Sequence, residues 1–131
     1  MLPTPTVSHF RKAAASSPQQ ACVMIYRDAE HTMIWDDKLA GPGDHEVPRD
    51  ECLAFDHHQF DAIQHAIREG RTLPDWLVID TRADGFYEFR ATSEYMNTVG
   101  SARLYFDRTE YDTFTKAVHK QEFERSAFGS D

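Results

Sequence analysis

The sequence contains one stretch twice, and this duplication constrains the fold more than any other feature. Residues 53–67 read Leu-Ala-Phe-Asp-His-His-Gln-Phe-Asp-Ala-Ile-Gln-His-Ala-Ile, and residues 104–118 read Leu-Tyr-Phe-Asp-Arg-Thr-Glu-Tyr-Asp-Thr-Phe-Thr-Lys-Ala-Val, at a constant offset (104 − 53 = 51). Each copy alternates apolar residues like the end of a strand, then has an aspartate followed three residues later by Gln or Glu. That spacing predicts a capping box with Asp56 or Asp107 as the N-cap of a helix. Two such copies indicate an internal duplication.

The residues that follow each aspartate have the spacing of an amphipathic helix. Apolar residues recur at i, i+3 and i+7, and they are Phe60, Ile63 and Ile67 in the first copy and Tyr111, Phe114 and Val118 in the second. We expect a first helix over 57–69, with Gly70 as its C-cap, and a second helix from 108 to about 122.

Two more apolar segments precede each copy and predict a strand hairpin. The expected strands are 21–26, 32–35 and 52–55 in the first half and 76–80, 86–90 and 102–106 in the second, with loops over 36–50 and 92–100. Aligning Val78 and Ile79 with Val23 and Met24 (78 − 23 = 55) places Arg82 at the position of Arg27. Each half therefore reads β-β-β-α.

The predicted fold is α+β, with two β-β-β-α repeats over 21–70 and 76–124, antiparallel sheet covered by helices on one face, and a pseudo-two-fold relation between the repeats. Residues 1–20 hold Pro3, Pro5 and Pro18 and are expected to form an irregular N-terminal segment, with Phe10 as its anchor. A repeat of about 60 residues has a marginal core by itself, so we expect the two repeats to pack as one compact unit.

Composition narrows the function classes. The chain has 131 residues and a net charge of −8, with 22 Asp and Glu against 14 Lys and Arg, which disfavours direct nucleic-acid binding and favours basic partners. It contains no apolar run of about 20 residues and no signal-peptide core, so we expect a cytoplasmic protein that does not span a membrane. Cys22 and Cys52 have no metal-binding spacing and are expected to be reduced, inert thiols.

Several segments resemble one family. Before Cys22-Val23 stands the segment Phe10-Arg11-Lys12-Ala13-Ala14-Ala15-Ser16-Ser17. The two return strands end in Ile34-Trp35-Asp36-Asp37-Lys38 and Phe89-Arg90-Ala91-Thr92-Ser93. The second helix is followed by Gln121-Glu122-Phe123. Together with the strand–helix motif, these segments resemble a tandem repeat of the actinobacterial domain of unknown function three-nine-seven, the BldB-like family. The resemblance implies a small intracellular regulatory protein that acts with a helix-turn-helix regulator. It brings no catalytic residues.

An alternative function uses the histidines. His58, Asp61 and His65 lie at i, i+3 and i+7 of the first helix, and His45 and Cys52 lie in or beside the preceding loop. These residues could hold a metal in a small toxin-like effector or metal-dependent enzyme. The same helical positions are also those of a solvated face, which we favour. We therefore predict no metal, no cofactor and no catalytic residues.

The candidate partner-binding residues come from the hairpins. Arg27 and Arg82, at equivalent predicted positions, either pair with a nearby acid in their hairpin turns or contact an acidic group on a partner, and Arg90 lies on a return strand. Trp35 and Tyr87 either pack in the core or lie on the exposed face of the sheet, where they are candidate aromatic anchors, since Trp and Tyr contribute strongly to interfaces. The predicted function is a non-enzymatic protein-interaction module whose partner is a helix-turn-helix regulator. A homodimer stays open.

Overall fold

The computed structural model describes residues 5–11, 23–28, 30–39, 43 and 45–124. In the first repeat the elements are β1 (Val23–Arg27), β2 (His31–Asp36), β3 (Leu53–Asp56) and α1 (His57–Glu69). In the second they are β4 (Val78–Thr81), β5 (Tyr87–Arg90), α2 (Met96–Val99), β6 (Leu104–Phe106) and α3 (Arg108–His119). Three short 3-10 helices are η1 (Val7–His9), η2 (Asp37–Leu39) and η3 (Arg49–Glu51).

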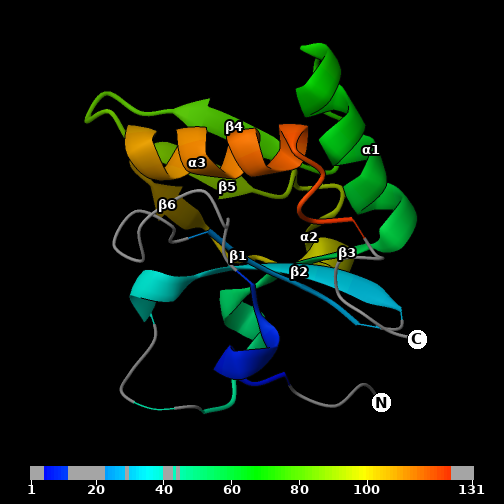
Figure 1. The fold of residues 1–131 in the computed structure, drawn as a ribbon, viewed down its shortest axis with the longest axis vertical. Coiled ribbons are helices and arrows are strands. Elements are labelled where there is room, and N and C mark those ends of the chain that lie inside the picture. Colours follow the sequence, from blue (N-terminus) through cyan, green and yellow to red (C-terminus); the bar gives the residue numbers. More distant parts are fainter. Residues whose placement is uncertain (1–4, 12–22, 29, 40–42, 44, 125–131) are drawn as a thin grey trace.

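The strands form two antiparallel sheets of three strands each, in the orders β1-β2-β3 and β4-β5-β6. Each sheet is followed by its long helix, so the predicted α+β fold with two β-β-β-α repeats is confirmed. Figure 1 shows the helices and the second repeat above the first sheet, with the N-terminal segment below it. The first sheet thus has the helices and the second repeat on one face and the N-terminal segment on the other.

Both predicted capping boxes are present. The side chain of Asp56 accepts from the Gln59 N–H at 2.7 Å, and the Gln59 side chain accepts from the Asp56 N–H at 2.9 Å. Asp107 and Glu110 make the same pair of hydrogen bonds, both at 2.8 Å. Gly70 has φ 66°, the left-handed conformation of a C-cap that glycine adopts without strain. The local signals therefore fixed the start of both helices.

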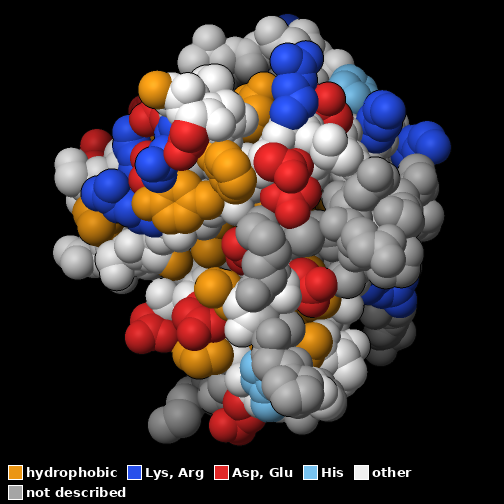
Figure 2. Space-filling model, turned by 90° about the vertical axis from the view of Figure 1, so that its left-hand side faces the viewer, with side chains coloured by type: hydrophobic (Ala, Val, Ile, Leu, Met, Phe, Trp, Pro, Cys, Tyr) orange, Lys and Arg blue, Asp and Glu red, His pale blue; other side chains and the backbone are white. Residues whose placement is uncertain are grey.

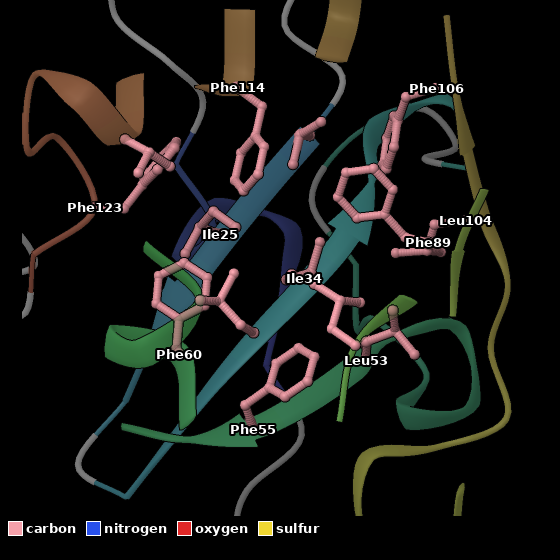
Figure 3. Close-up of a cluster of buried hydrophobic side chains, with 14 of the residues drawn as sticks. Ile25, Ile34, Leu53, Phe55, Phe60, Phe89, Leu104, Phe106, Phe114 and Phe123 are labelled. Atoms are coloured by element: carbon pink, nitrogen blue, oxygen red, sulfur yellow. The ribbon is translucent and has the colours of Figure 1, made fainter. Parts of the chain in front are cut away.

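One hydrophobic core contains residues of both repeats. Figure 3 shows Phe55, Phe60 and Ile34 of the first repeat turned toward the same space as the aromatic residues of the second. The fully buried members from the second repeat include Phe89, Phe106, Phe114 and Phe123. Helices α1 and α3 pack on each other, and β2 packs near β6. Neither repeat therefore closes its core alone.

A second, smaller cluster covers the opposite face of the first sheet. It is formed by Phe10, Met24, Met33, Trp35, Val47, Cys52 and Ala54. The N-terminal segment is held there by an isolated antiparallel bridge in which Arg11 and Ile25 exchange both backbone hydrogen bonds, at 2.8 and 2.9 Å. A second bridge joins Thr6 to Glu46. Phe10 is buried, as expected of an anchor, whereas the described part of the predicted irregular segment includes η1 and these bridges.

Some predicted boundaries were wrong. Helix α3 ends at His119 rather than near 122, and α2 occupies part of the predicted 92–100 loop. The strand predicted over 76–80 begins only at Val78, because Leu77 and Trp76 belong to the turn before it. Ala21, Cys22 and residues 12–20 lie outside the described residues. Among the described helices, none is long and apolar enough to cross a membrane.

Candidate functional site

The strand register decides which residues of the two repeats are equivalent. Ile34 pairs with both Ile25 and Leu53, and Phe89 pairs with both Ile79 and Leu104. Ile79 is therefore the counterpart of Ile25, an offset of 54 (79 − 25), not 55. The predicted equivalence of Arg82 with Arg27 was wrong by one residue, and a shift of one residue places a side chain on the other face of a sheet.

Arg27 is buried and bonded inside the molecule. Its guanidinium donates to the backbone oxygen of Phe123 at 2.9 Å and to the carboxylate of Asp61 at 2.9 Å. It also lies 5.0 Å from the ring centre of Phe60. Arg27 thus joins β1 to α1 and to the segment after α3. The prediction that it contacts an external partner was wrong, because its side chain is enclosed by these groups.

His57 belongs to the same group of interacting residues as Arg27. His57 Nδ1 lies 3.1 Å from the Thr32 hydroxyl and 3.3 Å from Arg27, and its Nε2 lies 2.9 Å from the backbone oxygen of Asp28. The carbonyl of Asp28 can only accept and the guanidinium of Arg27 can only donate, so Nε2 donates to Asp28 and Nδ1 accepts from Arg27. Hydrogen bonds on both ring nitrogens fix the orientation of the ring as well as its tautomer.

Trp35 is fully buried on the face of the first sheet that carries the smaller hydrophobic cluster, which we call the outer face. Its indole N–H donates to Glu51 at 3.1 Å, and its ring packs on Phe10 with 5.6 Å between ring centres. The prediction that Trp35 is an exposed anchor was therefore wrong. Tyr87 lies on the other face: it is half-buried against the shared core and stacks on Tyr111 at 4.2 Å with 5° between the ring planes. The two aromatic residues do not form one surface.

The outer face of the second sheet carries an exposed cluster of charged side chains. We define this face by Asp80, Arg82, Glu88, Arg90, Arg103 and Tyr105. Arg90 is paired with Asp80 and lies 3.5 Å from Glu88. Figure 2 shows basic, acidic and hydrophobic side chains side by side at its upper left, in the region of the second repeat. Two of the five predicted residues, Arg82 and Arg90, lie on this face.

Glu88 holds the cluster together. Its Oε2 lies 3.4 Å from the Arg103 guanidinium and accepts from the Tyr105 hydroxyl at 3.0 Å. The Arg82 guanidinium lies 4.9 Å from the ring centre of Tyr105, which is a cation–π distance. The side chain of Glu88 is 13% exposed, against 58% for Arg103. The cluster therefore has a fixed centre and exposed basic edges.

A pocket of about 270 Å³ borders this face. It is lined by Arg90, Ala91, Ser93, Met96, Gly100, Ser101, Ala102 and Arg103. The pocket thus has two guanidinium groups and two serines on its walls, with α2 and the residues after it forming the far side. These groups can donate hydrogen bonds to acidic or amide groups on a protein surface.

The histidine alternative gains no support from the geometry. Asp61 is bonded to Arg27, and His65 lies 3.1 Å from Glu69. Across the described part of the chain, no three His, Cys, Asp or Glu side chains gather as metal ligands would. Cys52 is buried and forms no disulfide, and burial raises the pKa of its thiol to about 12, which disfavours the reactive thiolate.

Sequence reasoning missed four members of the outer face: Asp80, Glu88, Arg103 and Tyr105. The signal that could have found them is strand alternation, because each lies next in sequence to a residue of the inner face, namely Ile79, Phe89 or Leu104. Comparison with known proteins supplies no further constraint: no family model, curated protein or solved structure matches the chain.

Proposed function

We propose that this protein is a non-enzymatic, intracellular protein-interaction module that binds its partner through the outer face of the second sheet. One observation carries the proposal. In the first repeat the equivalent face is covered by the N-terminal segment of the chain itself, whereas in the second repeat the described residues leave this face exposed. The N-terminal segment on the first sheet is thus an example, within the chain itself, of how a polypeptide segment can cover this face of a repeat.

The chemistry of the face favours a protein over a nucleic acid. Each of its arginines is already within ion-pair distance of an acid: Arg82 of Asp84, Arg90 of Asp80, and Arg103 of Glu88. Phosphate binding depends on basic groups free to replace counterions, and the whole chain carries −8. Arginine and tyrosine are enriched where protein interfaces gain most of their energy.

The proposed partner is a helix-turn-helix transcriptional regulator. Support comes from the resemblance to the BldB-like family and from the net charge of −8 of the whole chain, which attracts the basic surfaces of DNA-binding domains at long range. A complex of this kind would couple the chain to transcription without direct contact with DNA.

Surface plasmon resonance tests this proposal with the helix-turn-helix regulator encoded nearest to this gene, immobilised at two salt concentrations. Arg90→Ala combined with Arg103→Ala should weaken binding by about tenfold or more. The control is Arg108→Ala, which removes an arginine of 78% exposure at the start of α3. Unchanged affinity in the double variant would contradict the proposed face. Tight binding of the wild-type protein to naked DNA would contradict the choice of partner.

A further inference from the structure

The edge of the second sheet differs from the edge of the first. β1 is an edge strand, and Ile25 exchanges two backbone hydrogen bonds with Arg11 on the side away from β2. β4 occupies the same place in the second sheet, and Ile79 is the counterpart of Ile25. None of the described residues takes the place on β4 that Arg11 takes on β1.

The backbone groups of Ile79 point away from β5. In an antiparallel pair, residues alternate between hydrogen-bonded and non-hydrogen-bonded positions. The Arg82 N–H donates to the Phe86 oxygen at 2.7 Å, so counting back along β4 makes Ile79 a non-hydrogen-bonded position. Its N–H and C=O therefore face outward, as those of Ile25 do. An outward pair on an edge strand is a template for one more strand.

A groove of about 520 Å³ lies beside the start of this strand. It is lined by Thr72, Leu73, Pro74, Asp75, Leu77, Val78, Ile79, Thr92, Ser93 and Glu94. Half of these residues are apolar, and the only charged ones are the two acids. Asp75 and Glu94 are exposed and form no ion pair within the described part of the chain. The groove thus offers apolar contacts and unneutralised negative charge next to the open backbone groups.

We propose that the β4 edge binds an extended, basic segment of a partner protein, which adds to the sheet as an antiparallel strand. Main-chain hydrogen bonds to Ile79 would supply the pairing, and the groove would select apolar and basic side chains. The segment that the chain places on its own β1 edge has this character, since it reads Phe10-Arg11 and is extended at Phe10. This inference rests on the proposed function and names a second contact of the same partner.

A synthetic peptide tests the edge directly. The probe is an eight-residue peptide of alternating Val and Lys with blocked ends, titrated into the full-length protein labelled with ¹⁵N. We expect the amide signal of Ile79 to shift and the exchange of its proton with solvent to slow. A matching Val–Glu peptide should not bind. Absence of a shift at Ile79 with the Val–Lys peptide would overturn the proposal.

Methylation of the peptide backbone separates strand pairing from simple charge attraction without changing the protein. Two peptides carry N-methyl groups on either all Val or all Lys residues. The groove fixes which side chains face it, and therefore which backbone groups face Ile79. One methylated peptide should lose about tenfold or more in affinity and the other should keep most of it. An equal effect of both modifications would overturn the pairing.

Two protein variants complete the test. The double variant Asp75→Asn with Glu94→Gln should bind the Val–Lys peptide more weakly, and this affinity should depend much less on salt concentration. The control pair is Asp84→Asn with Glu69→Gln, which removes two exposed acids that do not line the groove. Equal weakening by both pairs would show that only net charge matters and would overturn the groove assignment.

The same variants distinguish this inference from the proposed function. If the regulator binds the wild-type protein and the Asp75/Glu94 variant equally, the inference fails while the proposed function stands. If the regulator binds neither, the proposed function fails, and the peptide results decide the edge by themselves. Sedimentation equilibrium supplies one more outcome: a dimer disrupted by the Val–Lys peptide would assign the edge to a second copy of the chain and overturn the proposal.

Discussion

The outer face of the first sheet is apolar and covered, whereas the outer face of the second is charged and exposed. At equivalent register positions, Trp35 corresponds to Arg90 and Met33 to Glu88. On the third strands, Ala54 corresponds to Tyr105. The inner faces and the helix N-caps, in contrast, have the same character in both repeats. The inner face and the N-cap are therefore the features that the two repeats share, and the outer face can serve either internal packing or an external contact.

The largest expected effect comes from exchanging the two outer faces at one position. Trp35→Arg should destabilise the protein by at least about 4 kcal/mol, because it removes a buried aromatic ring and places a charge under the N-terminal segment. Arg90→Trp should change stability by less than about 1 kcal/mol, since its position is partly open to solvent. Urea denaturation of both variants measures the two values. Similar losses of stability in the two variants would contradict the distinction between a covered outer face in the first sheet and an exposed one in the second.

The shared core gives the next largest effect. Phe114→Ala should cost about 3–5 kcal/mol, because it empties a site between Phe89 and Phe123. Its counterpart change, Ile63→Ala, should cost about 2–5 kcal/mol. Both variants should unfold in a single transition, since the two repeats fill one core. Hydrogen exchange measured by mass spectrometry should show both sheets losing protection together. Selective loss of protection in one sheet would contradict the shared core.

The two arginines that the sequence aligned should differ. Arg27→Met should destabilise the protein by about 1.5–3 kcal/mol, the value of hydrogen bonds to charged groups, because the buried guanidinium bonds Phe123 and Asp61. Arg82→Met should cost less than about 0.5 kcal/mol, since its side chain is 44% exposed. Thermal denaturation of the two variants measures this difference in stability. Equal shifts in Tm would contradict the conclusion that Arg27 and Arg82 occupy different environments.

The smallest predicted effects belong to the feature that the repeats share most closely. Asp56→Ala and Asp107→Ala should each destabilise the protein by about 1 kcal/mol through loss of the N-cap acceptor. Asp112→Ala, on the exposed side of α3, serves as the control for removal of an acid. Chemical denaturation should give matching losses for the two caps. A difference of more than about 1 kcal/mol between them would show that tertiary contacts outweigh the common local motif.

The predictable part of the fold was the part set by neighbouring residues. The cap, helix start and C-cap of α1 follow from residues within one turn of each other, so His57–Glu69 was predicted correctly to both ends. The equivalence of the first strands failed because the hairpin turns differ in length. Two residues separate Asp28 from its partner His31, and three separate Arg82 from Phe86. Gly85, with φ 88°, accommodates the longer turn.

The candidate site was predicted only in part, because exposure depends on distant contacts. Alternation placed Trp35 on the face opposite the helices, but its burial comes from Phe10 and the Arg11–Ile25 bridge, far away in the sequence. Arg27 reads as a turn residue, and its burial depends on Phe123 in the other repeat. Arg82 was selected because it was aligned with Arg27, an equivalence that the strand register rejects, and Arg90 because it lies on the return strand β5.

The bond from Arg27 to the backbone oxygen of Phe123 has a consequence for synthesis on the ribosome. The two residues are 96 positions apart, so the first strand emerges long before its acceptor exists. Until residue 123 has left the ribosome the guanidinium stays hydrated, and the space that Phe123 closes stays accessible to water and to chaperones. The core of this fold is therefore completed only after residue 123 has been synthesised. A product that stops short of residue 123 would lack both the ring and the carbonyl, and we expect proteases to remove it.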